Sequence, residues 1–204
     1  MRYPVPAPPL HRVSLTIKKS RFITSLGPAP DVGRAKVFVE GIRAEFADAT
    51  HNCWAFAAGP PGDSARVGFS DDGEPHGTAG KPMLNTLLHS DVGEVAAVVT
   101  RYYGGVKLGT GGLVRAYSDM VKLGLEGLSV RERVDAVLAR AILPHSAVGR
   151  FKRMLGEVEA AIQSAEYGAE ACFVVKLPKE RLPEMSGQLS HITSGSARVD
   201  VVEE

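Results

Sequence analysis

The spacing of apolar and polar residues along the chain predicts a mixture of helices and strands. Apolar residues recur every three or four positions over residues 32–47 and 113–125, which predicts amphipathic helices there. Shorter apolar runs at residues 13–25, 51–58 and 95–99 are typical of strands. These segments alternate unevenly, and this order favours an α/β sandwich with a mixed sheet over a regular doubly wound fold.

The segments between these runs are polar and rich in proline or glycine. Residues 1–11 contain four prolines, which exclude a helix and predict an extended arm. Residues 68–80 form a polar, glycine-rich stretch that predicts a long loop. Pro82 then suits the first position of a short helix, which we expect to end near His89.

The second half of the chain has the pattern of a strand, a helix, two strands, a helix and a strand. The strands are expected at 134–143, near 167, at 171–177 and at 197–202, and the helices at 148–162 and 182–189. This βαββαβ order is the ferredoxin-like arrangement. A charged run at residues 131–133 marks a boundary before it. We therefore expect a two-domain α+β protein with an arm at residues 1–11, an N-terminal domain at 12–130 and a C-terminal domain at 134–204.

Composition places the chain among soluble globular proteins and narrows its partners. Hydrophobic residues make up 44% of the 204 residues, and the formal net charge of +1 means that nucleic acid is attracted only by a local basic patch. No apolar run reaches the roughly 18 residues that cross a bilayer, and the N-terminus lacks the apolar core of a signal peptide. Cys53 and Cys172 lie far apart without metal-ligand spacing. We expect a reduced, cytoplasmic protein with no membrane partner.

Residues 100–115 carry the most informative pattern, a glycine-rich loop between an expected strand and an expected helix. Glycine lets the backbone approach a ligand closely, and the free N–H groups of a first helical turn favour anions. The candidate anion- or nucleic-acid-binding residues are Lys81, Arg101, Tyr103, Lys107, Thr110, Gly111, Gly112 and Arg115. Tyr103 beside Arg101 suits stacking on a base. The alternative is a tight crossover with solvated cations and a packed tyrosine, and the Gly-Lys-Ser/Thr triplet of a Walker loop is absent.

Two further motifs raise the question of catalysis. Asp71, Asp72 and Glu74 could hold Mg²⁺, but the spacing of a calcium loop is absent and the same residue types favour a structured turn. His51 and Cys53 are two apart on an expected strand, which places them on one face as a thiol–imidazole pair. Cys53 also fits simple packing in an apolar run. We predict no catalytic residues, no metal site and no cofactor.

Several of these stretches, taken together, resemble the IMPACT/YigZ family, known from bacteria and eukaryotes. They are residues 19–22 (KSRF), 51–55 (HNCWA), 70–75 (SDDGEP), 77–80 (GTAG) and 100–109 (TRYYGGVKLG). The likeness covers roughly residues 12 to 128 and implies an N-terminal domain like the second domain of a small-subunit ribosomal protein. It also implies a C-terminal domain like the last domain of elongation factor G. Eukaryotic relatives bind a ribosome-associated activator of a translation-regulating kinase, a partner that we do not transfer to this chain.

These observations favour a non-catalytic binding or regulatory protein that associates with RNA or the ribosome and is linked to the control of translation. A second hypothesis is that the chain binds a protein partner that acts in the control of translation. One alternative is an enzyme that acts on a phosphorylated small molecule or nucleotide, which predicts a pocket where the acidic and glycine loops converge. Another is a protein-docking module, which predicts an exposed apolar patch.

Overall fold

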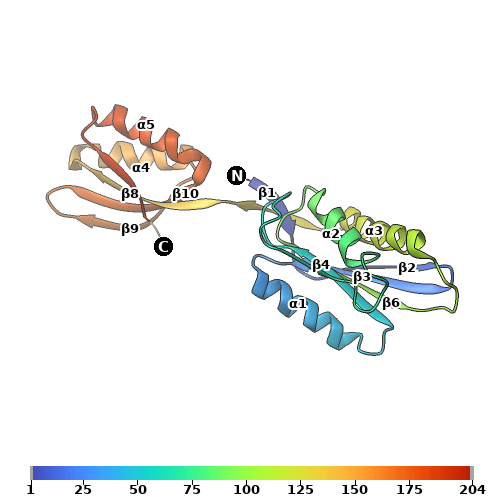
Figure 1. Ribbon diagram of the computed structural model, residues 1–204. Coiled ribbons are helices and arrows are strands. Elements are labelled where there is room, and N and C mark those ends of the chain that lie inside the picture. Colours follow the sequence, from blue (N-terminus) through green and yellow to red (C-terminus); the bar gives the residue numbers. More distant parts are fainter. Residues whose placement is uncertain (1, 203–204) are drawn as a thin grey trace. The chain divides into compact units, whose positions relative to one another are not determined.

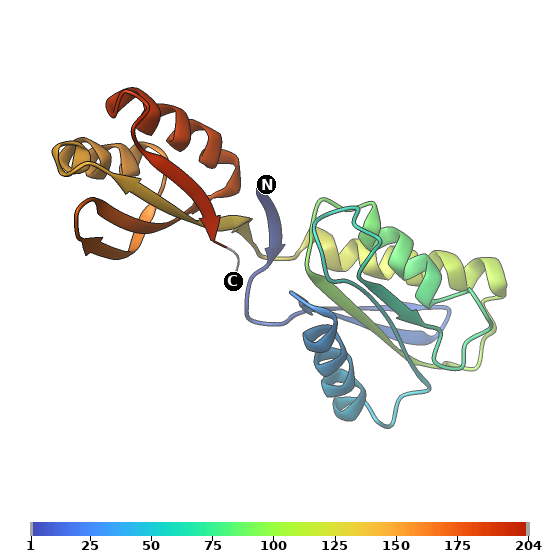
Figure 2. The same ribbon diagram turned by 60° about the vertical axis from the view of Figure 1, so that its left-hand side comes forward.

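The computed structural model describes residues 2–202, which form two compact units (Figures 1 and 2). One unit comprises Tyr3–Arg133, and the other comprises Arg2 together with the described residues from Val134 onward. The N-terminal residues expected as an arm include an extended strand, β1 (Arg2–Pro6), which pairs with β7 (Val130–Val134) in a two-stranded ribbon. No helix within residues 2–202 has the length and hydropathy needed to span a bilayer.

A five-stranded sheet forms the centre of the first unit, in the order β2-β3-β6-β4-β5. Its strands are β2 (His11–Ile17), β3 (Ser20–Pro28), β6 (Val95–Tyr102), β4 (His51–Ala57) and β5 (Val67–Ser70). All four neighbouring pairs are antiparallel, so the expectation of a mixed sheet is wrong. The direction of pairing depends on how the connections run across the sheet, which the periodicity of a single segment does not record.

Helices cover both faces of this sheet (Figure 1). Helix α1 (Val32–Glu45) lies on one face, and α2 (Gly80–Leu88) and α3 (Thr110–Glu126) lie on the other. Asp31 caps α1, because its carboxylate accepts a 2.7 Å hydrogen bond from the Arg34 amide. The arrangement confirms the expected α/β sandwich. Only part of the predicted 68–80 loop is irregular, since β5 occupies its start and α2 begins at Gly80.

The segment 13–25, expected as one strand, is a hairpin. Strands β2 and β3 pair antiparallel with Ile17 opposite Ser20, so Lys18 and Lys19 alone make the turn. Both lysines have positive φ, 44° and 66°, as two-residue hairpin loops require. The turn was missed because such loops usually carry glycine or asparagine, which reach positive φ with little strain.

The second unit has the expected ferredoxin-like βαββαβ fold. Its elements are β8 (Ala136–Leu143), α4 (Val148–Glu157), β9 (Ala161–Tyr167), β10 (Ala171–Pro178), α5 (Leu182–Ile192) and β11 (Arg198–Val202). Short 3₁₀ turns at His145–Ala147 and Lys179–Arg181 lead into the two helices. The sheet order is β11-β8-β10-β9, and both helices pack on one face around buried Phe151, Phe173 and Met185.

The strained β2–β3 turn yields the first prediction. Replacing Lys19 by glycine removes the steric cost of a positive φ, so Lys19→Gly should raise the free energy of unfolding by roughly 1 kcal/mol. Urea denaturation of both proteins measures this difference. The matched control is Lys36→Gly at an exposed position of helix α1, where glycine should cost about 1 kcal/mol. Equal destabilisation by both substitutions would contradict the strained turn.

Candidate ligand-binding site

A pocket of about 490 Å³ lies where the acidic loop after β5 meets the glycine-rich loop after β6. Its lining residues come from the start of β4, the acidic loop, the end of β6, the glycine-rich loop and the first turn of α3. They are Thr50, His51, Glu74, Pro75, Arg101, Tyr103, Lys107, Leu108, Gly109, Thr110 and Leu113. Two segments that are separate in the sequence therefore converge on one hollow.

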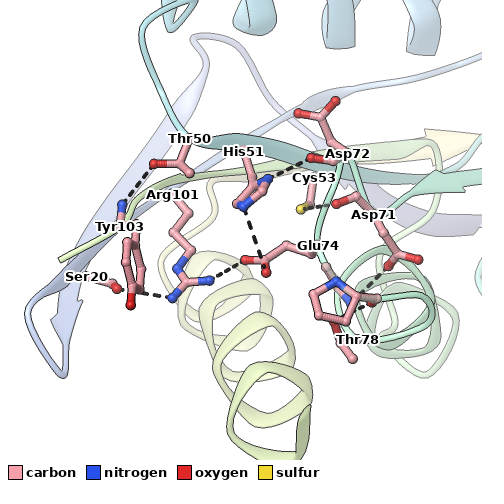
Figure 3. A network of polar contacts seen from close by, with 12 residues as sticks. Ser20, Thr50, His51, Cys53, Asp71, Asp72, Glu74, Thr78, Arg101 and Tyr103 are labelled. Atoms are coloured by element: carbon pink, nitrogen blue, oxygen red, sulfur yellow. Dashed lines mark hydrogen bonds and ion pairs between the residues drawn. The ribbon is translucent and has the colours of Figure 1, made fainter. Parts of the chain in front are cut away.

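A buried ion pair holds the acidic loop against the sheet at the back of this pocket (Figure 3). The Arg101 Nη1 donates to Glu74 Oε1 over 2.5 Å, and the two side chains are only 5% and 4% exposed. The same Glu74 oxygen accepts a 2.8 Å hydrogen bond from the Tyr117 hydroxyl of α3, while Arg101 Nη2 donates to Ser20 Oγ of β3 over 3.2 Å. One carboxylate thus joins the acidic loop, β6 and α3.

The Arg101 guanidinium is also enclosed by aromatic rings. Its central carbon lies 5.4 Å from the ring centre of Phe22 and 5.3 Å from that of Tyr103. The Nε atom has no hydrogen-bond partner among residues 2–202, which leaves one buried donor without an acceptor. Because Glu74 neutralises it and both rings cover it, Arg101 organises the pocket and is not the free cation that the sequence analysis assumed.

The acidic loop is held by its own carboxylates. Asp71 accepts hydrogen bonds from the amides of Gly77, Ala79 and Gly80 at 2.8–3.0 Å. Burial alone would raise the pKa of Asp71, but these three donors outweigh it and hold the pKa below its ordinary value. Asp72 accepts from the Asn52 amide over 2.7 Å. Together with Glu74, the three carboxylates are engaged in contacts within the chain, which favours the structured-turn interpretation over a magnesium site.

His51 and Cys53 do not form the thiol–imidazole pair that their spacing allowed (Figure 3). The Cys53 thiol is fully buried and donates to the Asp71 carbonyl over 2.9 Å. Burial raises the pKa of this thiol, so it stays protonated and is a poor nucleophile. The His51 Nδ1 donates to the Asp72 carbonyl over 2.8 Å, which leaves Nε2 facing the pocket, 4.0 Å from Glu74 Oε2.

The glycine-rich loop brings the first turn of α3 to the pocket wall. Gly109 has a φ of 76° and precedes the helix without a side-chain hydrogen bond to cap it. The first N–H groups of α3 are therefore not used by a capping side chain, and this end of the helix carries partial positive charge. Gly104 permits the loop to start close to the β2–β3 turn, since a Cβ there would clash with the Lys19 carbonyl.

The structure brings together part of the predicted site. Arg101, Tyr103, Lys107 and Thr110 line the pocket. Gly111 and Gly112 continue the first turn of α3, and Gly112 lines a second hollow with Arg115. Lys81 is exposed on α2 and is not among the lining residues.

Sequence reasoning did not include Thr50, His51 and Leu108 in a pocket, and it placed Glu74 in one only under the small-molecule alternative. His51 lies directly opposite Arg101 in the β4–β6 pairing, and the Thr50 hydroxyl accepts a 3.0 Å hydrogen bond from the Tyr103 amide. Only knowledge of the strand register would have placed Thr50 and His51 beside the glycine-rich loop, because no local motif connects them to it.

The fold and the pocket define a two-domain α+β protein with a candidate anion site in its N-terminal domain. Residues 18–125 match the model of the Impact N-terminal domain, and residues 142–196 match a domain of unknown function, DUF1949. The chain is 44% identical to the IMPACT family member YigZ of Escherichia coli (strain K12), over 98% of each chain. The protein belongs to the IMPACT family.

Other relatives agree with this assignment. An IMPACT family member of Haemophilus influenzae is 39% identical over 92% of this chain and 91% of its own. Protein IMPACT-A of Xenopus tropicalis is 31% identical over 50% of this chain and 32% of its own. A crystal structure described as that of an hypothetical protein has a TM-score of 0.70 and 43% identity, covering 100% of this chain and 98% of that one.

The hydrogen bonds of Asp71 give a pH-dependent prediction. Asp71→Asn should lower the free energy of unfolding at neutral pH by roughly 1–2 kcal/mol, because charged acceptors make stronger hydrogen bonds. The folded-state pKa lies below the ordinary value of 3.8, so this contribution is complete above that value and is lost as the pH falls through the folded pKa. Urea denaturation from pH 7 to pH 2 should show the two proteins converging in acid. A difference in the free energy of unfolding that stays constant from pH 7 to pH 2 would contradict this prediction.

The buried ion pair predicts a large effect of removing one partner. Arg101→Ala should cost roughly 3–5 kcal/mol of stability, because Glu74 is left buried without its counter-charge. Denaturant unfolding is the measurement, and Arg115→Ala, an exposed arginine of α3, is the control with a change within about 0.5 kcal/mol. Similar small effects for both arginines would mean that Arg101 does not organise the pocket.

Proposed function

We propose that this IMPACT family chain is a non-catalytic, cytoplasmic binding protein whose N-terminal pocket takes the phosphate backbone of single-stranded RNA. The observation that carries the proposal is the convergence of Lys107, the uncapped first turn of α3 and Tyr103 on one hollow. An ammonium group and helix amides suit a phosphate, and an aromatic ring suits a neighbouring base.

The charges around the pocket support an anionic ligand. Glu74, the acidic residue of the lining, is already paired with Arg101. Lys107 is exposed, and no ion pair is recorded for it within residues 2–202. The pocket therefore keeps a local positive charge although the whole chain is nearly neutral, which is the condition under which such a chain attracts nucleic acid.

Tyr103 is placed to contact a base beside that phosphate. The residue is 45% exposed, while its ring lies against the Arg101 guanidinium. A guanidinium that is fixed by Glu74 and Ser20 holds the ring in position before a ligand arrives. Preorganisation of this kind lowers the ordering cost of binding.

The context of translation rests on the resemblance of the two domains to parts of a ribosomal protein and of elongation factor G. A similar fold supports the hypothesis that the protein works in translation, but it does not identify the ligand or any reaction. A non-catalytic role is supported by the engagement of Asp71, Asp72 and Glu74 in contacts within the chain and by the protonated Cys53 thiol.

One observation favours a second candidate function, the binding and turnover of a phosphorylated small molecule. The acidic and glycine loops converge on a concave pocket, as that alternative predicted, and its volume of about 490 Å³ falls in the range of small-molecule sites. The His51 Nε2, 4.0 Å from Glu74 Oε2, belongs to a residue that lines this pocket and offers a proton acceptor.

The proposal predicts weak, salt-dependent RNA binding. A fluorescent eight-nucleotide oligouridylate should bind at 50 mM salt and lose affinity steeply by 200 mM, as phosphate contacts require. Lys107→Ala should weaken binding by roughly fivefold to tenfold for any base sequence, since phosphate contacts do not distinguish bases. Fluorescence anisotropy measures both effects.

Lys36→Ala is the matched control, because it removes the same charge from α1 on the opposite face of the sheet. Failure of the unaltered protein to bind RNA at low salt would overturn the proposal. Thermal stabilisation by a nucleoside triphosphate with no RNA binding would favour the second candidate instead.

A further inference from the structure

A second basic hollow lies beside the pocket, on the other side of Leu108. It has a volume of about 260 Å³ and is lined by Ile17, Lys18, Leu108, Gly112, Arg115, Ala116 and Asp119. Leu108 lines both hollows, and the first turn of α3 contributes Thr110 to one and Gly112 to the other. The two hollows therefore flank the same helix end.

The charges of the second hollow are positive in sum. Lys18 and Arg115 contribute two cations, and no ion pair is recorded for either within residues 2–202. Asp119 also lines the hollow, but its carboxylate lies 3.9 Å from the Lys122 ammonium in an exposed pair. Lys18 and Arg115 thus remain available to an anion, as Lys107 does in the first pocket.

The position of Lys18 is fixed by the fold. The turn that carries it has positive φ at both lysines, and its Lys19 backbone lies against Gly104 at the start of the glycine-rich loop. The Ser20 hydroxyl accepts hydrogen bonds from the Gly104 amide and from Arg101 Nη2, each over 3.2 Å. Ser20, which directly follows the Lys18–Lys19 turn, therefore links this turn by a hydrogen bond to the same Arg101 that lines the first pocket.

We infer that Lys18 and Arg115 form a second phosphate subsite, so that the ligand is an RNA strand with at least two phosphates and not a mononucleotide. This inference rests on the proposed function of the first pocket. It also specifies the path of the RNA strand, which runs from the first pocket to the second hollow. One phosphate lies with Lys107 and the first turn of α3, and another, further along the strand, lies with Lys18 and Arg115. Leu108 separates the two subsites.

Ligand length and charge removal together test the inference. Anisotropy and competition are measured at 50 and 200 mM salt with oligouridylate of eight nucleotides and with uridine 5′-monophosphate. The double variant Lys18→Ala/Arg115→Ala should bind the oligonucleotide roughly tenfold more weakly, and the slope of log affinity against log salt should fall by about 1.4. Its affinity for the mononucleotide should change by less than about twofold, because one phosphate occupies only the Lys107 subsite.

Two further variants separate charge from folding. Arg34→Ala/Lys36→Ala removes the same two charges from α1 and should leave oligonucleotide binding within about twofold. Lys18→Gly/Arg115→Ala should behave like the alanine double variant while keeping the positive φ of the turn without strain.

The outcomes distinguish the inference from the proposed function. If the unaltered protein binds the oligonucleotide and Lys107→Ala weakens it, but the Lys18/Arg115 variants match the control, the second subsite is wrong and the first stands. Equal losses for oligonucleotide and mononucleotide also overturn the two-phosphate site. Absence of RNA binding by the unaltered protein overturns the proposed function and the inference with it.

Discussion

The N-terminal domain depends on one buried ion pair, between Arg101 at the end of β6 and Glu74 in the acidic loop. The two side chains are almost completely removed from water, so each needs the other, and further hydrogen bonds engage Arg101 Nη2 and Glu74 Oε1 although Arg101 Nε stays without a partner within residues 2–202. Tyr117 and Ser20 provide those bonds and thereby attach α3 and β3 to the same centre. Figure 3 shows this cluster, and Arg101 and Glu74 both line the pocket.

The ion pair also decides which charges can reach a ligand. Arg101 is held and neutralised, so the positive charge at the two hollows comes from Lys107, Lys18, Arg115 and the first amides of α3, which no side chain within residues 2–202 caps. This separation explains how a chain of net charge +1 can present a local anion site. Cys53, Asp71 and Asp72 form hydrogen bonds that hold the acidic loop, and this loop contributes Glu74 and Pro75 to the pocket wall.

Much of the fold could be predicted from the sequence because most elements have a strong local pattern. The apolar stripe of α3, with Leu113, Met120 and Val121 buried, has the period of a helix. The βαββαβ order of the second half was likewise predicted and confirmed. The Lys18–Lys19 turn and the four-residue strand β5 were missed, because the turn lacks glycine or asparagine and the strand is short and contains a glycine.

The candidate site was only partly predictable for a different reason. The motif around residues 100–112 has a local signature, so Tyr103, Lys107 and Thr110 were predicted as binding residues from it, and all three line the pocket. The burial of Arg101 depends on Glu74, 27 residues earlier, and the exposure of His51 to the pocket depends on strand register. Long-range contacts of this kind leave no trace in the spacing of a single segment.

The most direct test maps the ligand onto the molecule. In a ¹⁵N-labelled sample at low salt, titration with an eight-nucleotide oligouridylate should shift the amide signals of residues 103–112 and of the Lys18–Lys19 turn. Signals of α1 and of the C-terminal sheet should stay in place. Shifts confined to α1 or to the C-terminal domain, or no shifts at all, would contradict the account.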